Sequence, residues 1–172
     1  NIENDYLRSA TNSENMNFVY ELSKLLKIKK NSFIKSMNSF LGLPHRHEIF
    51  FKKKGITFIN DSKATSLQAT MLALSNSENI YWILGGLPKD KDRINLRYVK
   101  NNIVKSYIIG KNINFFKRQL RNKVKYSVTR NLKNAIVSAL KDIRLFKKTN
   151  NTILLSPGAA SFDQFKNFEK RG

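Results

Sequence analysis

After residue 48 the sequence alternates between short apolar runs and helix-like segments, and this alternation limits the fold more than any other feature. Strand-like runs lie at 80–84, 104–109, 125–128 and 152–155. Helical patterns lie near 94–101, 112–121 and 131–144, and a last helix is expected to open near Ser161. Parallel strands joined by helices produce such a pattern. The sequence therefore predicts an α/β fold with a doubly wound, mostly parallel sheet and helices on both faces.

Two helices are expected before this alternation. Apolar residues recur at helical spacing over 13–28, directly after capping side chains at 12–15. A second helix is expected over 31–40, because the helix breakers Gly42 and Pro44 follow it. The same glycine and proline mark the best domain boundary in the sequence.

A hairpin is expected where the pattern changes. Two β-rich runs within 48–59 flank a turn at Lys54 and Gly55. The chain is therefore expected to divide into residues 1–41, which are helical, and residues 42–172, which carry a Rossmann-like sheet.

The composition excludes several classes of protein. With 41% hydrophobic residues, the 172-residue chain can bury a sizeable core and is not a disordered tail. It has no Cys and two His, which excludes disulfides and thiolate metal sites. No apolar run approaches the roughly 20 residues of a membrane span, so we expect a cytoplasmic protein without a membrane partner. The chain starts at Asn1 and shows no secretory signal, so we expect a fragment.

The net charge of +20 results from 32 Lys and Arg against 12 Asp and Glu. Clustered cations would indicate nucleic-acid binding, because they neutralise phosphates. Here the cations are spread along the chain without the interleaved aromatics of an RNA-binding strand. The 21 Asn and the abundant Lys and Ile indicate A- and T-rich coding. A solvated surface is therefore the preferred interpretation, and a basic nucleic-acid-binding module is the alternative.

The loops that follow strands are the candidate site, because open α/β sheets bind ligands at the carboxyl ends of their strands. The first loop, 60–65, places Asp61, Lys63 and hydroxyl groups between a strand and a helix, where free backbone N–H groups attract anions. It could hold a ribose, a phosphate or a substrate carboxylate. Asp61 and Ser62 could equally be plain helix caps.

The second loop contains Gly85, Gly86 and Lys89. Paired glycines allow positive φ and a close approach of a ligand to the backbone. Lys89 would then project from the end of the strand. A tight turn with a solvated Lys89 is the alternative, and the charges of 89–92 are expected to be mostly solvated.

The third loop, 156–161, has small side chains that leave room for a substrate beside Ser161. In the alternative interpretation, a capped helix starts here and its Phe162, Phe165 and Phe168 side chains face the core. For Phe165 this alternative is the preferred interpretation. No His and acid partners for Ser161 are evident, so a nucleophilic triad is not expected.

Both histidines flank one arginine, in the segment His45-Arg46-His47. This segment offers too few ligands for a metal ion, and adjacent side chains on an extended chain point differently, so no metal site is expected. A planar guanidinium at a domain junction can stack on a base or clamp a phosphate, which makes Arg46 a candidate for binding.

Taken together, four segments resemble, in the same order, the carboxy-terminal third of the Mur ligases: 42–46, 60–65, 84–89 and 156–172. The D-glutamate-adding branch of this family is the most similar. The family's His-Asn-x-x-Asn segment is present in part, with Thr11 in place of the His. By this resemblance, residues 1–41 would be closing helices of the central ATP-binding domain, and residues 42–172 would be the amino-acid-binding domain.

The resemblance implies an ATP-dependent amide ligase of peptidoglycan precursor synthesis. In the family, the carboxylate of UDP-N-acetylmuramoyl-L-alanine is converted to an acyl phosphate, which the amine of D-glutamate attacks. Such chemistry needs charge neutralisation and positioning more than a covalent nucleophile. A sibling Mur ligase or a folylpolyglutamate-type ligase is the alternative.

The resemblance also assigns roles to individual residues. Lys63 would be catalytic, beside the transferred phosphate. The nucleotide would be bound by Asn12, Asn15, Arg46 and Asp61. D-Glutamate would be surrounded by His45, Thr65, Lys89, Ser161, Phe162 and Phe168. ATP and Mg²⁺ are the expected cofactors, but the family's phosphate loop and magnesium ligands lie upstream of this chain. We therefore expect this chain to be inactive alone. We also expect a monomer that binds no specific nucleic acid.

Overall fold

The computed structural model describes residues 2–4, 7, 10–89 and 91–172. The chain forms two compact units, Asn1–Leu43 and Pro44–Gly172, and each is described by itself below. The division lies two residues after the expected boundary between residues 41 and 42. Asp90, part of the expected solvated charge run, lies outside the described residues, as does Asn1.

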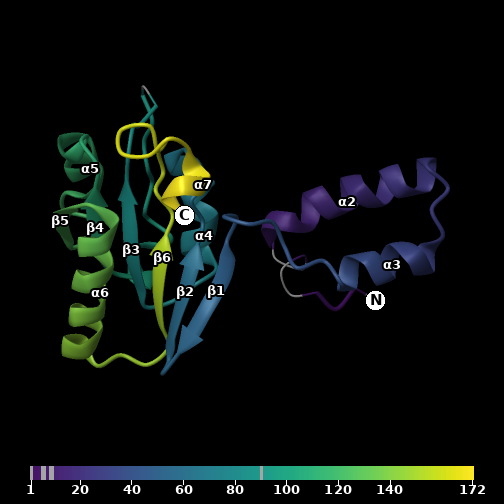
Figure 1. The fold of residues 1–172 in the computed structure, drawn as a ribbon, viewed down its shortest axis with the longest axis horizontal. Coiled ribbons are helices and arrows are strands. Elements are labelled where there is room, and N and C mark those ends of the chain that lie inside the picture. Colours follow the sequence, from purple (N-terminus) through teal and green to yellow (C-terminus); the bar gives the residue numbers. More distant parts are fainter. Residues whose placement is uncertain (1, 5–6, 8–9, 90) are drawn as a thin grey trace. The chain divides into compact units, whose positions relative to one another are not determined.

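The described part of the first unit includes the helices α2 (Ala10–Leu25) and α3 (Lys30–Asn38) (Figure 1). The expected caps at 12–15 are wrong, because α2 begins before them and they lie inside the helix. α2 ends at Leu25 rather than at residue 28. Lys27 adopts a φ of +55°, and this left-handed conformation cannot continue a right-handed helix.

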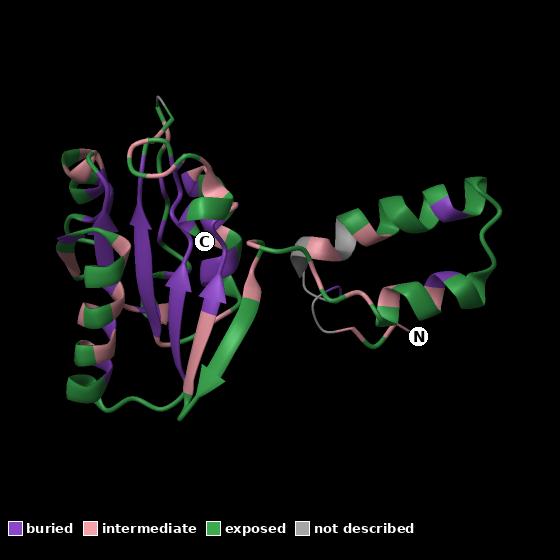
Figure 2. Cartoon of the chain, viewed as in Figure 1, coloured by how far each residue is buried: buried purple, intermediate pink, exposed green. Residues whose placement is uncertain are grey.

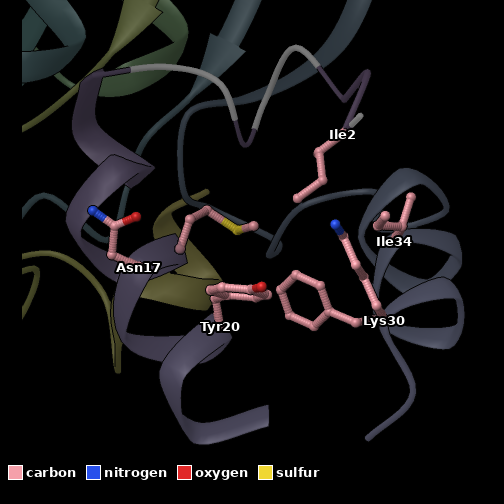
Figure 3. Close-up of a pocket in the computed structure, with 7 residues that line it drawn as sticks. Ile2, Asn17, Tyr20, Lys30 and Ile34 are labelled. Atoms are coloured by element: carbon pink, nitrogen blue, oxygen red, sulfur yellow. The ribbon is translucent and has the colours of Figure 1, made fainter. Parts of the chain in front are cut away.

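A small aromatic contact holds these helices together. The ring centroids of Tyr20 and Phe33 lie 5.4 Å apart, and Phe33 is buried. A pocket of about 280 Å³ lies beside them (Figure 3), and its lining residues are Ile2, Met16, Asn17, Tyr20, Lys30, Phe33 and Ile34. Much of the apolar surface of α2 is exposed, including Phe18 and Leu25.

The second unit contains a six-stranded sheet in the order β1-β2-β6-β3-β4-β5 (Figure 1). β1 pairs antiparallel with β2, and the other neighbouring strands pair in parallel. The strands are β1 (Glu48–Lys53), β2 (Ile56–Asn60), β3 (Ile80–Gly85), β4 (Ile103–Ile109), β5 (Tyr126–Arg130) and β6 (Asn151–Leu155). The expected hairpin at Lys54 and Gly55 and the mostly parallel α/β sheet are confirmed.

Helices cover both faces of this sheet, and the alternation of side chains along the strands explains the two layers. On β3, Trp82 and Leu84 pack in one core with α4 (Leu67–Ser75) and α5 (Ile113–Leu120). Tyr81 and Ile83 belong to a second core with α6 (Leu132–Phe146). The central strands are therefore buried on both sides (Figure 2), which explains their continuous apolar runs.

The expected helix over 94–101 is wrong. The segment is irregular and ends in a short 3₁₀ turn, η1 (Lys100–Asn102). Ile94, Leu96 and Val99 are all buried, and the N–H group of Ile94 donates to the side chain of Gln119 at 3.2 Å. The three apolar side chains therefore pack in the core without forming the expected helix.

The expected last helix at Ser161 is also wrong. One turn forms there, because the Ser161 carbonyl accepts from the N–H groups of Gln164 and Phe165. A short helix, α7 (Phe168–Arg171), starts later, with the Asn167 side chain accepting from the Lys170 N–H at 2.9 Å. Among the described residues, no helix is long and apolar enough to cross a membrane.

Candidate functional site

The loops at the carboxyl ends of β2, β3 and β6 are joined by hydrogen bonds. We name them the β2 loop (61–66), the β3 loop (86–89) and the β6 loop (156–160). The Asp61 N–H donates to the Leu155 carbonyl at the end of β6, at 2.8 Å. Leu87 and Ala160 exchange two backbone hydrogen bonds, at 2.8 and 3.0 Å. Three loops that are far apart in the sequence therefore form one continuous surface.

Asp61 is held inside this surface by the protein itself. Its carboxylate accepts from the Ser156 hydroxyl at 2.7 Å and from the His47 N–H at 3.1 Å. Burial raises the pKa of Asp61 to about 6, although these two hydrogen bonds and the charge of Arg46 act in the opposite direction.

The helix cap lies elsewhere in the β2 loop. The Ser66 side chain accepts from the Ala69 N–H and caps α4, so the interpretation of Asp61 and Ser62 as plain caps is wrong.

Lys63, His45 and Phe168 come together next to Asp61. The ammonium group of Lys63 lies 4.0 Å from the centroid of the Phe168 ring, a favourable cation–π distance. The His45 ring stands edge-on to the same ring, with the centroids 6.0 Å apart. The His45 carbonyl accepts from the Lys63 N–H, and its ring nitrogen Nδ1 lies 2.9 Å from the Asn60 amide nitrogen. Three predicted site residues therefore share one corner of the sheet edge.

The glycines of the β3 loop permit close packing against protein backbone. Gly85 has a φ of +138°, and a Cβ there would lie 2.0 Å from the Ile109 carbonyl oxygen. At Gly86, with a φ of +133°, a Cβ would lie 2.3 Å from the Ala160 carbonyl oxygen. Lys89 is exposed just beyond them. The loop is thus fixed on both sides, with its lysine free to meet a solute.

Part of the charge run after Lys89 is not solvated. The Asp92 carboxylate accepts from the Leu67 N–H at 2.9 Å, in the first turn of α4. Acidic groups are favoured at such a helix terminus. Asp92 therefore tethers the end of this run to the helix that follows the β2 loop.

The residues from 161 onward, the C-terminal segment, extend over the neighbouring strands. Ser161 is buried, whereas Phe162 is 70% exposed and Phe165 is half-buried. The Asp163 carboxylate accepts from the Lys111 N–H at 2.8 Å, in the loop that follows β4. This tertiary contact ties the turn that follows Ser161 to the loop after β4.

Arg171 is a buried member of the site that sequence reasoning missed. Its Nε donates to the Ser62 hydroxyl at 3.0 Å, and its Nη2 donates to the Ser62 carbonyl at 2.9 Å. Burial lowers the pKa of Arg171 to about 10, against an opposing contribution from Asp163. In the sequence, nothing distinguishes this arginine from the other basic residues.

The remaining predicted residues are less enclosed. Arg46 is exposed and Thr65 is half-buried at the mouth of the β2 loop. Asn12 is half-buried and Asn15 is exposed on α2, in the first unit. Among the described residues, no cluster of three or more His, Asp or Glu side chains could hold a metal ion.

Comparisons with known proteins give a consistent result, although no protein-family model matches the chain. A protein from Wolbachia sp. subsp. Brugia malayi is 39% identical over 163 residues, which are 95% of this chain and 32% of the relative. One from Rhizobium meliloti is 37% identical over 96% of this chain and 36% of the relative. One from Rickettsia bellii is 33% identical over 99% of this chain and 38% of the relative. All three are named UDP-N-acetylmuramoylalanine–D-glutamate ligase.

The resemblance to the Mur ligases is confirmed. The similarity runs through nearly the whole chain. The chain spans about a third of the length of these relatives.

Proposed function

We propose that this chain is the amino-acid-binding part of an ATP-dependent ligase that adds D-glutamate to UDP-N-acetylmuramoyl-L-alanine in peptidoglycan precursor synthesis. The observation that carries the proposal is the meeting of Lys63, Phe168 and the β3 and β6 loops at one sheet edge, in a chain whose relatives bear this name. Residues 1–41 would belong to the nucleotide-binding domain, and residues 42–172 would form the amino-acid-binding domain.

The site would offer D-glutamate opposite charges and hydrogen-bond donors. The substrate is a dianion, so its carboxylates need cations and hydrogen-bond donors. Lys63 and Lys89 would supply the cations, and Thr65 and Ser161 would supply hydroxyl donors. Phe162, Phe168 and His45 would limit the space around the substrate. Since α7 begins only at Phe168, a helix dipole at Ser161 contributes nothing to this binding.

Asp61 and Arg46 are the proposed nucleotide contacts of the second unit. Asp61 keeps free acceptor positions beside its two hydrogen bonds, because a carboxylate offers about four lone-pair sites, and would take a ribose hydroxyl. Arg46, exposed nearby, would meet a phosphate or a base. Asn12 and Asn15 would contact the adenine. ATP, with Mg²⁺ held by other parts of the enzyme, would supply the phosphoryl group that activates the carboxylate. Lys63 would hold the negative charge of that carboxylate in place.

A chimeric ligase tests the proposal. This chain replaces the corresponding third of the Wolbachia relative, and phosphate release from ATP is measured with UDP-N-acetylmuramoyl-L-alanine and either D-glutamate, L-glutamate or L-lysine. A separate assay supplies a glutamyl folate as the carboxylate substrate and L-glutamate as the amine. D-Glutamate with UDP-N-acetylmuramoyl-L-alanine alone should support turnover. Turnover with another amino acid would instead support a sibling ligase, and turnover with the folate and L-glutamate would support the folylpolyglutamate branch.

Two variants then separate the proposed substrate contacts from nucleotide binding. In Lys89→Ala and Ser161→Ala, the KM for D-glutamate should rise about 10-fold or more, because each variant removes a hydrogen bond to a charged group. The KM for ATP should stay unchanged. Lys91→Ala, an exposed lysine two residues further along, is the matched control and should resemble the unmodified chimera. Equal rises in both KM values would contradict the assigned roles. We further expect the complete enzyme to be a cytoplasmic monomer.

A further inference from the structure

Arg171 is a buried cation, and within the described part of the chain its hydrogen bonds go to neutral oxygen atoms. It is 2% exposed, and its guanidinium donates to the hydroxyl and carbonyl of Ser62 and, at 3.5 Å, to the Gly85 carbonyl. Among the described residues, the ion pairs within 4 Å are Lys24–Glu21 and Lys105–Asp142, so no carboxylate pairs directly with Arg171. With a pKa of about 10, this arginine stays charged at neutral pH. Burying such a charge is costly, so its retention needs a physical reason.

The geometry of the guanidinium supplies one reason. Its planar fork reaches the β2 loop and the end of β3 at the same time, which a lysine ammonium cannot do with the same fixed directions. The fit is close, because a Cβ at Gly86 would lie 3.1 Å from Nη1 of Arg171. We name these hydrogen bonds from Arg171 to Ser62 and Gly85 the Arg171 bridge.

The Arg171 bridge holds both the backbone next to Lys63 and the aromatic ring that Lys63 contacts. Ser62 is the residue directly before Lys63, so holding its carbonyl and hydroxyl fixes the backbone from which Lys63 projects. The same Ser62 hydroxyl donates to the Phe168 carbonyl at 2.8 Å. Phe168 in turn provides the ring over which the Lys63 ammonium lies. The backbone and the ring that define the place of this ammonium are therefore both tied to Arg171.

We propose that Arg171 is a positioning residue that holds the Lys63 ammonium over the Phe168 ring, where Lys63 meets the reacting carboxylate. Its role in turnover rests on the proposed function, whereas the positioning itself is a property of this chain. Arg171 acts through Lys63 and does not touch the substrate.

Nuclear magnetic resonance on the 172-residue chain tests the positioning. A ring current shifts protons above an aromatic face upfield, so the ε-methylene resonance of Lys63 should lie upfield of those of the exposed lysines. In Arg171→Met this resonance should move to the position of an exposed lysine. If Arg171→Met does not fold, Ser62→Ala takes its place in the experiment. Ser62→Ala removes the hydroxyl that bonds both Arg171 and Phe168, and it should give the same change. Lys170→Met, an exposed residue of the same helix, removes one positive charge and should leave the resonance in place.

The chimeric ligase tests the consequence for turnover by a double-mutant cycle. Arg171→Lys should lower kcat about 10- to 100-fold, because small displacements of a reacting group cost that much. In a Lys63→Met background, Arg171→Lys should cause no further loss, whereas a purely structural role would lower kcat by the same factor in both backgrounds.

Two outcomes would overturn the proposal: an unchanged Lys63 resonance in both Arg171→Met and Ser62→Ala, or additive losses in the cycle. A chimera without D-glutamate-dependent turnover would instead refute the proposed function, and the resonance experiment would still decide the positioning.

Discussion

Asp61 should make the stability of the second unit depend on pH in a defined direction. Its pKa rises from 3.8 to about 6 in the folded protein, mainly because burial disfavours the charged carboxylate. One pKa unit corresponds to about 1.4 kcal/mol, so the shift amounts to about 3 kcal/mol of folding free energy. Because the folded-state pKa is the higher one, this contribution is fully present below pH 3.8 and is lost as the pH rises through about 6.

The assay compares the chain with Asp61→Asn, which keeps the size of the side chain and cannot ionise. Trp82 is the only tryptophan, is fully buried in β3 and donates to the Ser156 carbonyl at 2.8 Å, so its fluorescence reports unfolding of this unit. Urea unfolding at several pH values between 3.5 and 7.5 gives the free energy of unfolding for both proteins. The unmodified chain should lose about 3 kcal/mol relative to Asp61→Asn across this range.

The difference between the free energies of unfolding of the two proteins cancels the contributions of all other titrating groups. Glu169→Gln, at an exposed site outside this hydrogen-bond network, is the control and should follow the unmodified chain. The reasoning would be refuted if the free energy of unfolding depended on pH in the same way for the chain and for Asp61→Asn. It would also be refuted if the chain became more stable relative to Asp61→Asn as the pH rises.

Three further predictions concern stability and use the same unfolding assay. Gly85→Ala should cost at least about 3 kcal/mol, because its Cβ would lie 2.0 Å from the Ile109 carbonyl oxygen at a φ of +138°; a loss below about 1 kcal/mol would contradict this. Tyr81→Phe should raise stability by about 1 kcal/mol, because the buried Tyr81 hydroxyl has no hydrogen-bond partner within the described part of the chain; a clear loss would show a partner. Asn131→Ala should lower stability by about 1 kcal/mol, because the Asn131 side chain caps α6 by accepting from the Asn134 N–H at 2.8 Å. Lys133→Ala, on the exposed surface of the same helix, is the control for that cap.

The strands could be predicted from the sequence because their signal is local. β3 was expected over 80–84 and spans Ile80–Gly85, and β6 was expected over 152–155 and spans Asn151–Leu155. Both are buried on two faces, which favours nearly continuous apolar runs in the sequence. Such runs need no knowledge of distant partners.

The errors arose where distant partners decide the structure. The segment 94–101 contains enough apolar residues for a helix, but Ile94, Leu96 and Val99 pack in the core shared with α4 and α5, and the Ile94 N–H bonds to Gln119, 25 residues away. In the turn at Ser161, the side chain of Asp163 accepts a hydrogen bond from Lys111, 52 residues away. No periodicity within either segment reveals these contacts.

In the candidate site, too, the features with a local sequence signal could be predicted and those that depend on distant partners could not. The rule that ligands bind at the carboxyl ends of strands indicated the β2, β3 and β6 loops, which are joined in the structure. Arg171 was missed because its burial depends on Ser62, 109 residues earlier in the chain. A basic residue near the end of a cationic sequence gives no local sign of such a partner.

The binding of D-glutamate tests the central claim most directly. Backbone amide resonances of the 172-residue chain would be recorded while D-glutamate or, separately, L-glutamate is added. We predict that D-glutamate shifts the resonances of Lys63, Lys89 and Ser161 together, with one dissociation constant, and that L-glutamate shifts them less at equal concentration. Shifts confined to other surfaces, or identical shifts with both enantiomers, would contradict the account.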